Sequence, residues 1–240
     1  MRLNRLKYSG GAAAVAALMV FAASANAGAL QVSPINIEVQ GNVSTSVENL
    51  ENKGTTVINA QVRVFKWEHK DGKETMVPTT DVVASPPALK IEPGAKATLR
   101  VVRLLKTPVV GEETYRLIID DIPPPPSRAG DSVSFAVRHA IPVFFQAAGI
   151  KTQLEWTAKM IGADLELRAT NKGQLHARIA QLIVSQNGAT VAAVNGLAGY
   201  ALPADFDTWK LKAKGVHSGS TIAIKASTND GPVDTKIQVQ

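Results

Sequence analysis

Four consecutive prolines, Pro123–Pro126, separate two strand-like runs, Thr114–Ile122 and Ser132–Phe145. Proline has no backbone N–H to donate and holds its φ angle nearly fixed, so neither strand can continue through this connector. Gly130 and Asp131 add turn-forming residues to it. We therefore predict a long hairpin made of these two strands.

The second strand of this hairpin is asymmetric. It carries large apolar side chains at Val133, Phe135 and Val137, with only Ser or Ala between them. Successive side chains of a strand lie on opposite faces. One face is therefore strongly apolar and the other carries only small side chains, a pattern that suits a strand that lends side chains to something else.

Strand-like segments recur at roughly the ten-residue spacing of all-β proteins, with Gly, Pro and Asn between them, and no amphipathic helix exceeds two turns. This pattern is typical of β-sandwiches. The other expected strands are Leu30–Val39, Thr45–Glu51, Thr56–His69, Ala97–Leu105, Gln153–Lys159, Asp164–Thr170, Gln174–Val184, Thr190–Val194, Thr208–Lys214, Thr221–Ser227 and Lys236–Val239. Ala84–Ala88 contains two prolines, which suits an edge or irregular segment.

The length fits two domains, because one immunoglobulin-type sandwich takes about 100 residues. The short segment 147–149 is a plausible linker, and the turns Asn52–Gly54 and Asn171–Gly173 occupy similar places in the two halves. We predict an all-β fold of two tandem immunoglobulin-like β-sandwich domains, residues 28–146 and 150–240. A single large barrel is the alternative.

Residues 1–27 have the features of a secretory signal peptide. Arg2, Arg5 and Lys7 precede an apolar run that ends near the small-residue triplet 25–27. The run is shorter than the ~20 residues that span a bilayer, and no later segment approaches that length. We expect cleavage after residue 27 and no membrane insertion; a short membrane anchor is the alternative.

Composition excludes several classes of function. The chain has no cysteine, so thiol catalysis, thiolate metal sites and disulfides are excluded. The formal net charge of +6 includes the three basic residues of the signal segment, and no basic stripe with interleaved aromatic residues is present. We therefore expect no binding to nucleic acid.

No arrangement of catalytic residues is found. The four histidines are not at metal-ligand spacing, and there is no Gly-x-Ser-x-Gly or phosphate-binding glycine loop. Asp120 and Asp121 are adjacent and point to opposite faces of a strand. Glu112 and Glu113 are expected at a solvated turn, and His176 at the tip or flank of a strand. We predict no enzymatic activity, no metal and no cofactor.

The chain resembles the PapD-like periplasmic pilus chaperones of chaperone–usher pathways over essentially its whole mature length. The details are most similar to the archaic, Csu-type branch. The family marks are Pro93–Ala95 before a basic strand, the strand that ends in Asp121–Pro123, the alternating run Ser134–Phe145 and the turn Asn171–Gly173. The archaic marks are Leu30–Val39, Val62–Trp67, Tyr115–Leu117, Gly199–Tyr200 and Trp209.

This resemblance implies donor-strand complementation in the periplasm, with pilin subunits and an outer-membrane usher as partners. The donor residues would be Val133, Phe135 and Val137, with Ile141 extending the set. The alternative is that these side chains fill the protein's own core. An exposed apolar edge is normally avoided, so in the free protein we expect self-association or the proline-rich connector to cover it.

The family also implies a basic anchor for the C-terminal carboxylate of the pilin, but the usual basic positions are absent: the first strand has none, and Pro142 stands at the other. If the hairpin pairs Arg116 with Arg138, their like charges need a compensating carboxylate. We therefore predict Arg116 and Arg138 as the anchor, with Arg103 as a third candidate. The alternatives are pairing with an acid of the same chain, such as Glu155, and a register shifted by a bulge near Pro142.

Domain orientation is expected to depend on other residues than in the family. Asp121 stands where relatives have an acid, but Gln146 replaces its expected basic partner. We expect Trp156 to pack near the linker instead.

Two other functions are considered: a structural or adhesive subunit of a surface fibre, and a carbohydrate-binding module. The first is disfavoured because Gly28–Val39 begins almost directly as a strand, with no donor extension. The second is disfavoured because the few aromatic residues lie mostly within strand patterns.

Overall fold

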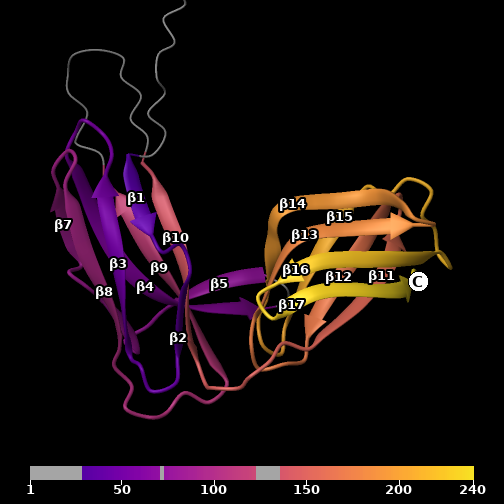
Figure 1. Ribbon diagram of the computed structural model, residues 1–240, viewed down its shortest axis with the longest axis horizontal. Helices are drawn as coiled ribbons and strands as arrows, with labels where there is room; N and C mark the ends of the chain where they lie inside the picture. Colours follow the sequence, from indigo (N-terminus) through magenta and orange to yellow (C-terminus); the bar gives the residue numbers. More distant parts are fainter. Residues whose placement is uncertain (1–28, 71–72, 123–135) are drawn as a thin grey trace, which may run out of the picture.

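The computed structural model describes residues 29–70, 73–122 and 136–240. Every regular element assigned in these ranges is a β-strand, and the strands form two β-sandwiches in tandem (Figure 1). The predicted all-β, two-domain fold is confirmed, and the single barrel is excluded. No helix of the described chain is long and apolar enough to cross a membrane.

The first domain is built from two sheets. One has the strand order β1-β3-β8-β6; the other has the order β2-β10-β9-β4-β5, with β7 also pairing with β4. The strands are Leu30–Ser33 (β1), Ile37–Gln40 (β2), Thr45–Asn52 (β3), Ile58–Lys70 (β4), Lys73–Pro78 (β5), Val82–Ser85 (β6), Ala88–Ile91 (β7), Lys96–Arg103 (β8), Glu112–Asp121 (β9) and Arg138–Gln146 (β10).

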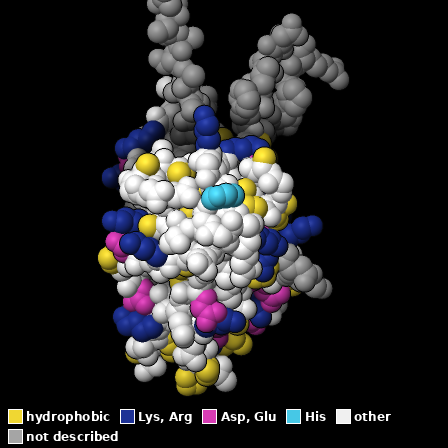
Figure 2. Space-filling view, turned by 90° about the vertical axis from the view of Figure 1, so that its right-hand side faces the viewer, with side chains coloured by type: hydrophobic (Ala, Val, Ile, Leu, Met, Phe, Trp, Pro, Cys, Tyr) yellow, Lys and Arg dark blue, Asp and Glu magenta, His cyan; other side chains and the backbone are white. Residues whose placement is uncertain are grey.

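The second domain has a three-stranded sheet, β11-β12-β15, and a four-stranded sheet, β14-β13-β16-β17. Figure 2 views this end of the molecule, where basic and acidic side chains are scattered among polar and apolar ones. The strands are Leu154–Ile161 (β11), Asp164–Asn171 (β12), Ala177–Gln186 (β13), Ala189–Ala201 (β14), Phe206–Leu211 (β15), Thr221–Thr228 (β16) and Gly231–Gln238 (β17).

The predicted strand Leu30–Val39 is in fact two strands in different sheets. β1 pairs antiparallel with β3, whereas β2 runs parallel to β10. Pro34 lies between them, and a residue without an N–H cannot continue a ladder of hydrogen bonds. The segment therefore crosses from one sheet to the other and closes one end of the sandwich.

The hairpin register differs from the predicted one by four residues. Arg116 lies opposite Pro142, and Arg138 lies opposite Asp120. This register places Ile141 opposite Leu117 in the core, whereas the predicted one would have aligned Ile141 with Glu113 at the end of β9. Because four is an even number, each side chain keeps its face and only its cross-strand partners change.

Each domain has its own apolar core, and a smaller cluster lies between the domains. The two large cores fill the space between the paired sheets. The third cluster contains Trp67 and Phe144 from the first domain and Leu202 from the second, with Tyr200 packed against it. The two domains are thus joined by side-chain packing as well as by the linker.

Candidate functional site

A buried hydrogen-bonded pair, Glu112 and His176, connects the two domains. The His176 N–H donates to Glu112 Oε1 at 3.0 Å, and His176 Nδ1 lies 2.8 Å from Glu112 Oε2. Both side chains are fully buried. The prediction of a solvated Glu112 is wrong, because the fold closes the second domain over its side chain. His176 lies at the flank of a strand, as predicted, directly before β13, but it is buried.

Gln146 contributes to the same contact, since its Nε2 donates to Glu112 Oε2 at 3.1 Å. Next to it, the Phe144 ring stacks on the His176 imidazole, with ring centroids 3.6 Å apart and planes 8° from parallel. Trp156 is not part of this interface. It stacks on Trp209 within the second domain at 5.9 Å, so the expectation that Trp156 holds the domains is wrong.

A second contact lies at the tip of the β4–β5 hairpin, which reaches toward the second domain (Figure 1). There His69 Nδ1 is 2.6 Å from Asp205 Oδ2. Together with the Glu112–His176 pair, this contact fixes the domains on either side of a cleft.

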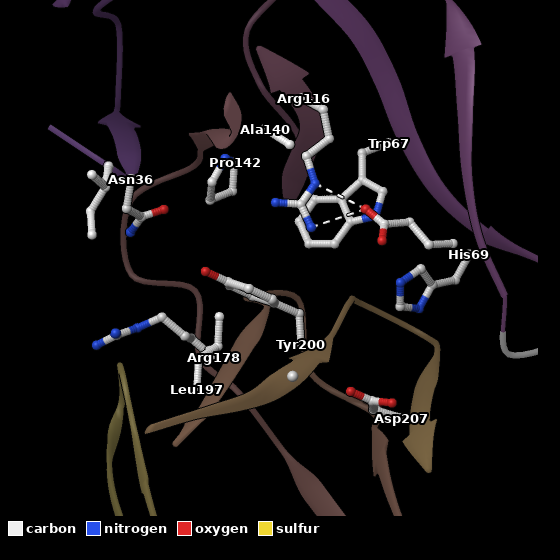
Figure 3. A pocket seen from close by; sticks show the side chains of 13 residues that line it. Asn36, Trp67, His69, Arg116, Ala140, Pro142, Arg178, Leu197, Tyr200 and Asp207 are labelled. Atoms are coloured by element: carbon white, nitrogen blue, oxygen red, sulfur yellow. Dashed lines mark hydrogen bonds and ion pairs between the residues drawn. The ribbon is translucent and has the colours of Figure 1, made fainter. Parts of the chain in front are cut away.

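The cleft has a volume of about 560 Å³ and is lined by residues of both domains. Arg116 of β9 lies against its wall, with its guanidinium 3.6 Å from the Trp67 ring centroid. Its Nε and one terminal nitrogen are each 3.0 Å from Glu74 Oε1. Figure 3 shows these bonds on one side of Arg116 and the cleft on the other.

A second arginine faces the same cleft from the opposite domain. Arg178 at the start of β13 is exposed and lines the cleft, and no acidic side chain of the described residues pairs with it. Figure 3 shows Tyr200 between Arg178 and Arg116. Burial raises the pKa of the Tyr200 phenol, and the positive charges of Arg116 and Arg178 partly oppose this effect. Two guanidinium groups and a phenol therefore surround the same space.

Arg178 was not predicted from the sequence, because the residues around it do not distinguish it from an ordinary solvated arginine. It alternates with buried residues on an ordinary strand, as a solvated arginine would. Its place at the cleft depends on how the second domain sits on the first. The adjacent buried His176, after the Asn171–Gly173 turn, was the only available hint.

The other two predicted anchor arginines are bound by acids of their own chain. Arg138 Nε donates to Asp120 Oδ1 at 2.6 Å, and Arg63 binds the other oxygen of the same carboxylate. These hydrogen bonds, with Arg138 first, lower the pKa of Asp120. The predicted Arg116–Arg138 juxtaposition is therefore wrong, and the alternative of an intramolecular acid holds, with Asp120 in place of Glu155.

Arg103 is buried and structural. Its Nε and one terminal nitrogen donate to the two oxygens of Glu113 at 2.8 and 2.7 Å, and the other terminal nitrogen donates to the carbonyls of Leu105 and Thr107. Four of its five N–H donors are thus used within the chain. The prediction of Arg103 as an anchor is corrected, and its side chain instead holds the loop after β8.

The predicted donor strand is described only in part. Val133 and Phe135 lie outside the described residues. Val137 is half-buried, and its carbonyl accepts from the Asp121 N–H at 2.9 Å. Ile141 is 4% exposed and belongs to the first domain's own core. For Ile141 the alternative of an ordinary core residue is correct.

One edge of β10 is open along its first half. β2 pairs only with Val143–Gln146. Within the described chain, Arg138–Pro142 pair with β9 on one side and have no strand on the other. Unpaired backbone groups along a sheet edge are a template for another strand.

Comparisons with known proteins agree with this architecture. The family model described as "Pili and flagellar-assembly chaperone, PapD N-terminal domain" matches residues 29–151, about half of the chain. The comparison with curated protein sequences returned no match.

Solved structures match along nearly the whole chain. The pre-assembly complex of the CsuC chaperone with CsuE, from archaic chaperone–usher Csu pili of Acinetobacter baumannii, matches at 26% identity and a TM-score of 0.67, covering 88% of this chain and 98% of that one. The Salmonella enterica SafA pilin–SafB chaperone complex matches at 18%, with a TM-score of 0.61 and coverage of 87% and 96%. The Pseudomonas aeruginosa CupB2 chaperone matches at 15%, with a TM-score of 0.56 and coverage of 87% and 100%.

These matches support a chaperone role in pilus assembly and not a structural role in the fibre. The chain belongs to the PapD-like pili and flagellar-assembly chaperones, a family of non-enzymatic periplasmic proteins.

Proposed function

We propose that this chaperone binds pilin subunits by donor-strand complementation and delivers them to an outer-membrane usher. The observation that carries the proposal is the open edge of β10, which lies next to a cleft containing Arg116. Complexes of a chaperone with a tip subunit and with a pilin, in the Csu and Saf systems, support this choice of partner.

The open edge supplies backbone hydrogen bonds to an incoming strand. Val133, Phe135 and Val137 have the same parity in the sequence as Ile141, Val143 and Phe145, which fill the first domain's core. Inserted into a pilin, each large apolar side chain would contribute roughly 1.5–3 kcal/mol. Ile141 then marks where the strand changes from the chaperone's own core to the core of its partner.

The cleft would hold the terminal carboxylate of the pilin. Arg116 and Arg178 approach it from the two domains, and Arg can bind a carboxylate through two parallel hydrogen bonds. In the free protein, the Glu74 carboxylate contacts two nitrogens of the Arg116 guanidinium. The terminal carboxylate of the pilin would replace Glu74 there. Residues 1–27 would act as a cleaved signal peptide for export.

The test is co-purification of the tagged mature protein from the periplasm of its host, with mass identification of bound proteins. One variant carries Val133→Asp, Phe135→Asp and Val137→Asp. The matched control carries Ser132→Asp, Ser134→Asp and Ala136→Asp, the same added charge on the other face of the same segment.

We expect a pilin-like protein bound one-to-one by the parent, lost in the apolar-face variant and retained by the control. Retention by the apolar-face variant would show that these side chains are not donors. Absence of any such partner from the parent would contradict the proposed function itself.

A further inference from the structure

Two neighbouring loops at one end of the first domain expose large apolar side chains. They are residues 41–44, between β2 and β3, and residues 104–111, between β8 and β9. Their exposed apolar members, which we call the apolar tip, are Val43, Leu104, Leu105 and Val110. The loops form the lower end of the first domain in Figure 1, and apolar side chains are visible at the lower end of the molecule in Figure 2.

The apolar tip is contiguous across the two loops. The Arg103 N–H donates to the Ser44 carbonyl at 2.8 Å, which extends the β3–β8 ladder to the ends of the two strands. Continued by one residue, this register places Val43 opposite Leu104, with both side chains on the outer face of the sheet. These two residues and Leu105 line one depression of about 480 Å³. Single exposed apolar residues are ordinary on a protein surface, whereas a contiguous group marks an interaction site.

The β8–β9 loop is fixed in this conformation by hydrogen bonds to its backbone. One terminal nitrogen of the buried Arg103 donates to the carbonyls of Leu105 and Thr107 at 2.7 and 2.8 Å. At the other end of the loop, the Ala147 N–H donates to the Gly111 carbonyl at 2.8 Å. Turning the apolar side chains inward would break hydrogen bonds to a buried guanidinium, so their exposure is part of the folded structure.

The charge of the loops fits a negatively charged partner. Lys106 is the only charged residue in the two loops, and it is exposed. The two acids that follow the second loop do not offset it, because the Glu112 side chain is fully buried and Glu113 binds Arg103. The tip therefore combines apolar side chains with one free positive charge.

The size of the tip favours a lipid surface over a protein. A specific protein interface takes about 20–30 residues on each side, whereas the tip offers four apolar side chains at the ends of two loops. Apolar side chains beside a basic one suit shallow insertion into a bilayer surface that carries anionic head groups. The family is periplasmic, so membranes lie on both sides of it. We propose that the apolar tip docks the chaperone reversibly on such an anionic membrane surface.

Docking at this end leaves the open edge of β10 accessible. The loop precedes Glu112 at one end of β9, whereas Arg138, at the start of the open edge, pairs with Asp120 at the other end. Membrane docking is therefore compatible with binding of a pilin and does not depend on the proposed function.

The test is flotation of the mature protein with lipid vesicles. One set contains phosphatidylethanolamine and phosphatidylglycerol in a three-to-one ratio, and the other contains phosphatidylcholine alone. We expect binding to the anionic vesicles to be about fivefold tighter, the effect of one lysine near an anionic surface. Lys106→Gln should abolish most of this preference.

The variant Leu104→Ser, Val110→Ser removes two side chains of the apolar tip. It should bind the anionic vesicles at least about tenfold more weakly, because less apolar surface enters the bilayer. The matched control is Ile161→Ser, Ile183→Ser, which changes two exposed isoleucines of the second domain. It should bind the vesicles like the parent.

A fluorescent label locates the contact while the rest of the tip stays intact. The chain has no cysteine, so Val110→Cys and Thr157→Cys each provide one site for a polarity-sensitive dye. Val110 is 88% exposed in the tip, and Thr157 is exposed on β11 of the second domain. On anionic vesicles the emission should shift to the blue for the label at position 110 and stay unchanged at position 157.

Three results would overturn the proposal. The first is absence of the parent from the vesicles at millimolar lipid, and the second is an equal loss of binding in the tip variant and its control. The third is a tip variant that floats like the parent but no longer co-purifies a protein partner, which would assign the apolar tip to a protein interface.

Discussion

At the scale of single residues, Glu48 is the most unusual side chain of the first domain. It is fully buried on the same face of β3 as Leu50, and neither carboxylate oxygen has a hydrogen-bond partner among the described residues. Desolvation raises the pKa of Glu48 to about 7. Glu48 therefore binds a proton more tightly in the folded protein than in the unfolded chain, where its pKa is near 4.5.

The raised pKa makes stability depend on pH. The folded state is favoured below about pH 4.5, and this contribution is lost as the pH rises through 7. Glu48→Met should remove this dependence and stabilise the domain at pH 8 by on the order of 3 kcal/mol. Urea unfolding of both proteins at pH 5 and pH 8 measures the effect.

Glu92→Gln is the control, because Glu92 is more than half exposed and pairs only with Lys90. It should keep the pH dependence of the parent. If the Glu48→Met variant also keeps it, Glu48 does not titrate in this range.

The arginines give a second prediction at this scale. Arg116→Ala should weaken pilin binding by about tenfold or more, because a buried ionic contact is lost. Arg138→Ala should change it by less than about twofold, since Arg138 is committed to an exposed pair with Asp120. Calorimetric titration of each variant with the co-purified pilin measures both affinities. A larger loss of affinity for Arg138→Ala than for Arg116→Ala would contradict the assignment of the cleft as the binding site for the terminal carboxylate.

At the scale of strands and hairpins, most strands of the first domain and nearly all strands of the second were predicted from the alternation of apolar and polar residues and from the turn residues between them. β11, β12, β13 and β16 begin within three residues of their predicted positions. The errors have local causes. Pro34 divides the first strand between two sheets, and the short strand β7 had been joined to the end of β6 as one irregular segment.

The candidate site was harder to predict than the strands, because it depends on register and on domain packing. Arg116 was identified by its place in the hairpin, although the register used to argue for it was four residues off. Glu112 and His176 meet across the domain boundary, and Arg178 lines the cleft between the domains. Periodicity within one strand carries no signal for such contacts. A polar residue buried between domains looks like a solvated one in the sequence.

The β4–β5 hairpin brings Glu74 to Arg116, and it yields a prediction for this element. Glu74 is 47% exposed, so its ion pair contributes little stability. Glu74→Gln removes a carboxylate that competes with the terminus of the pilin and should strengthen binding by at most about fivefold. Glu68→Gln on the same hairpin, which pairs with Lys66, is the control. Weaker binding by the Glu74 variant would mean that Glu74 positions Arg116 and does not compete for it.

At the scale of the whole molecule, the buried Glu112–His176 pair joins two domains that each have a complete core. Removing Glu112 leaves the buried donors of His176 without a partner, at a cost of about 1–3 kcal/mol for each unpaired group. Glu112→Ala should therefore separate unfolding into two calorimetric transitions and broaden the range of domain angles seen by small-angle X-ray scattering. A single transition with an unchanged scattering profile would show that the aromatic contacts alone fix the domains.

In the proposed complex, the open edge of β10 and the segment before it become part of the bound pilin. Hydrogen exchange of the backbone amides of residues 132–141, measured with and without the co-purified pilin, tests this directly. We expect these amides to be much more strongly protected in the complex than in the free chaperone. Unchanged exchange in this segment, with new protection elsewhere, would contradict donor-strand complementation by this chain.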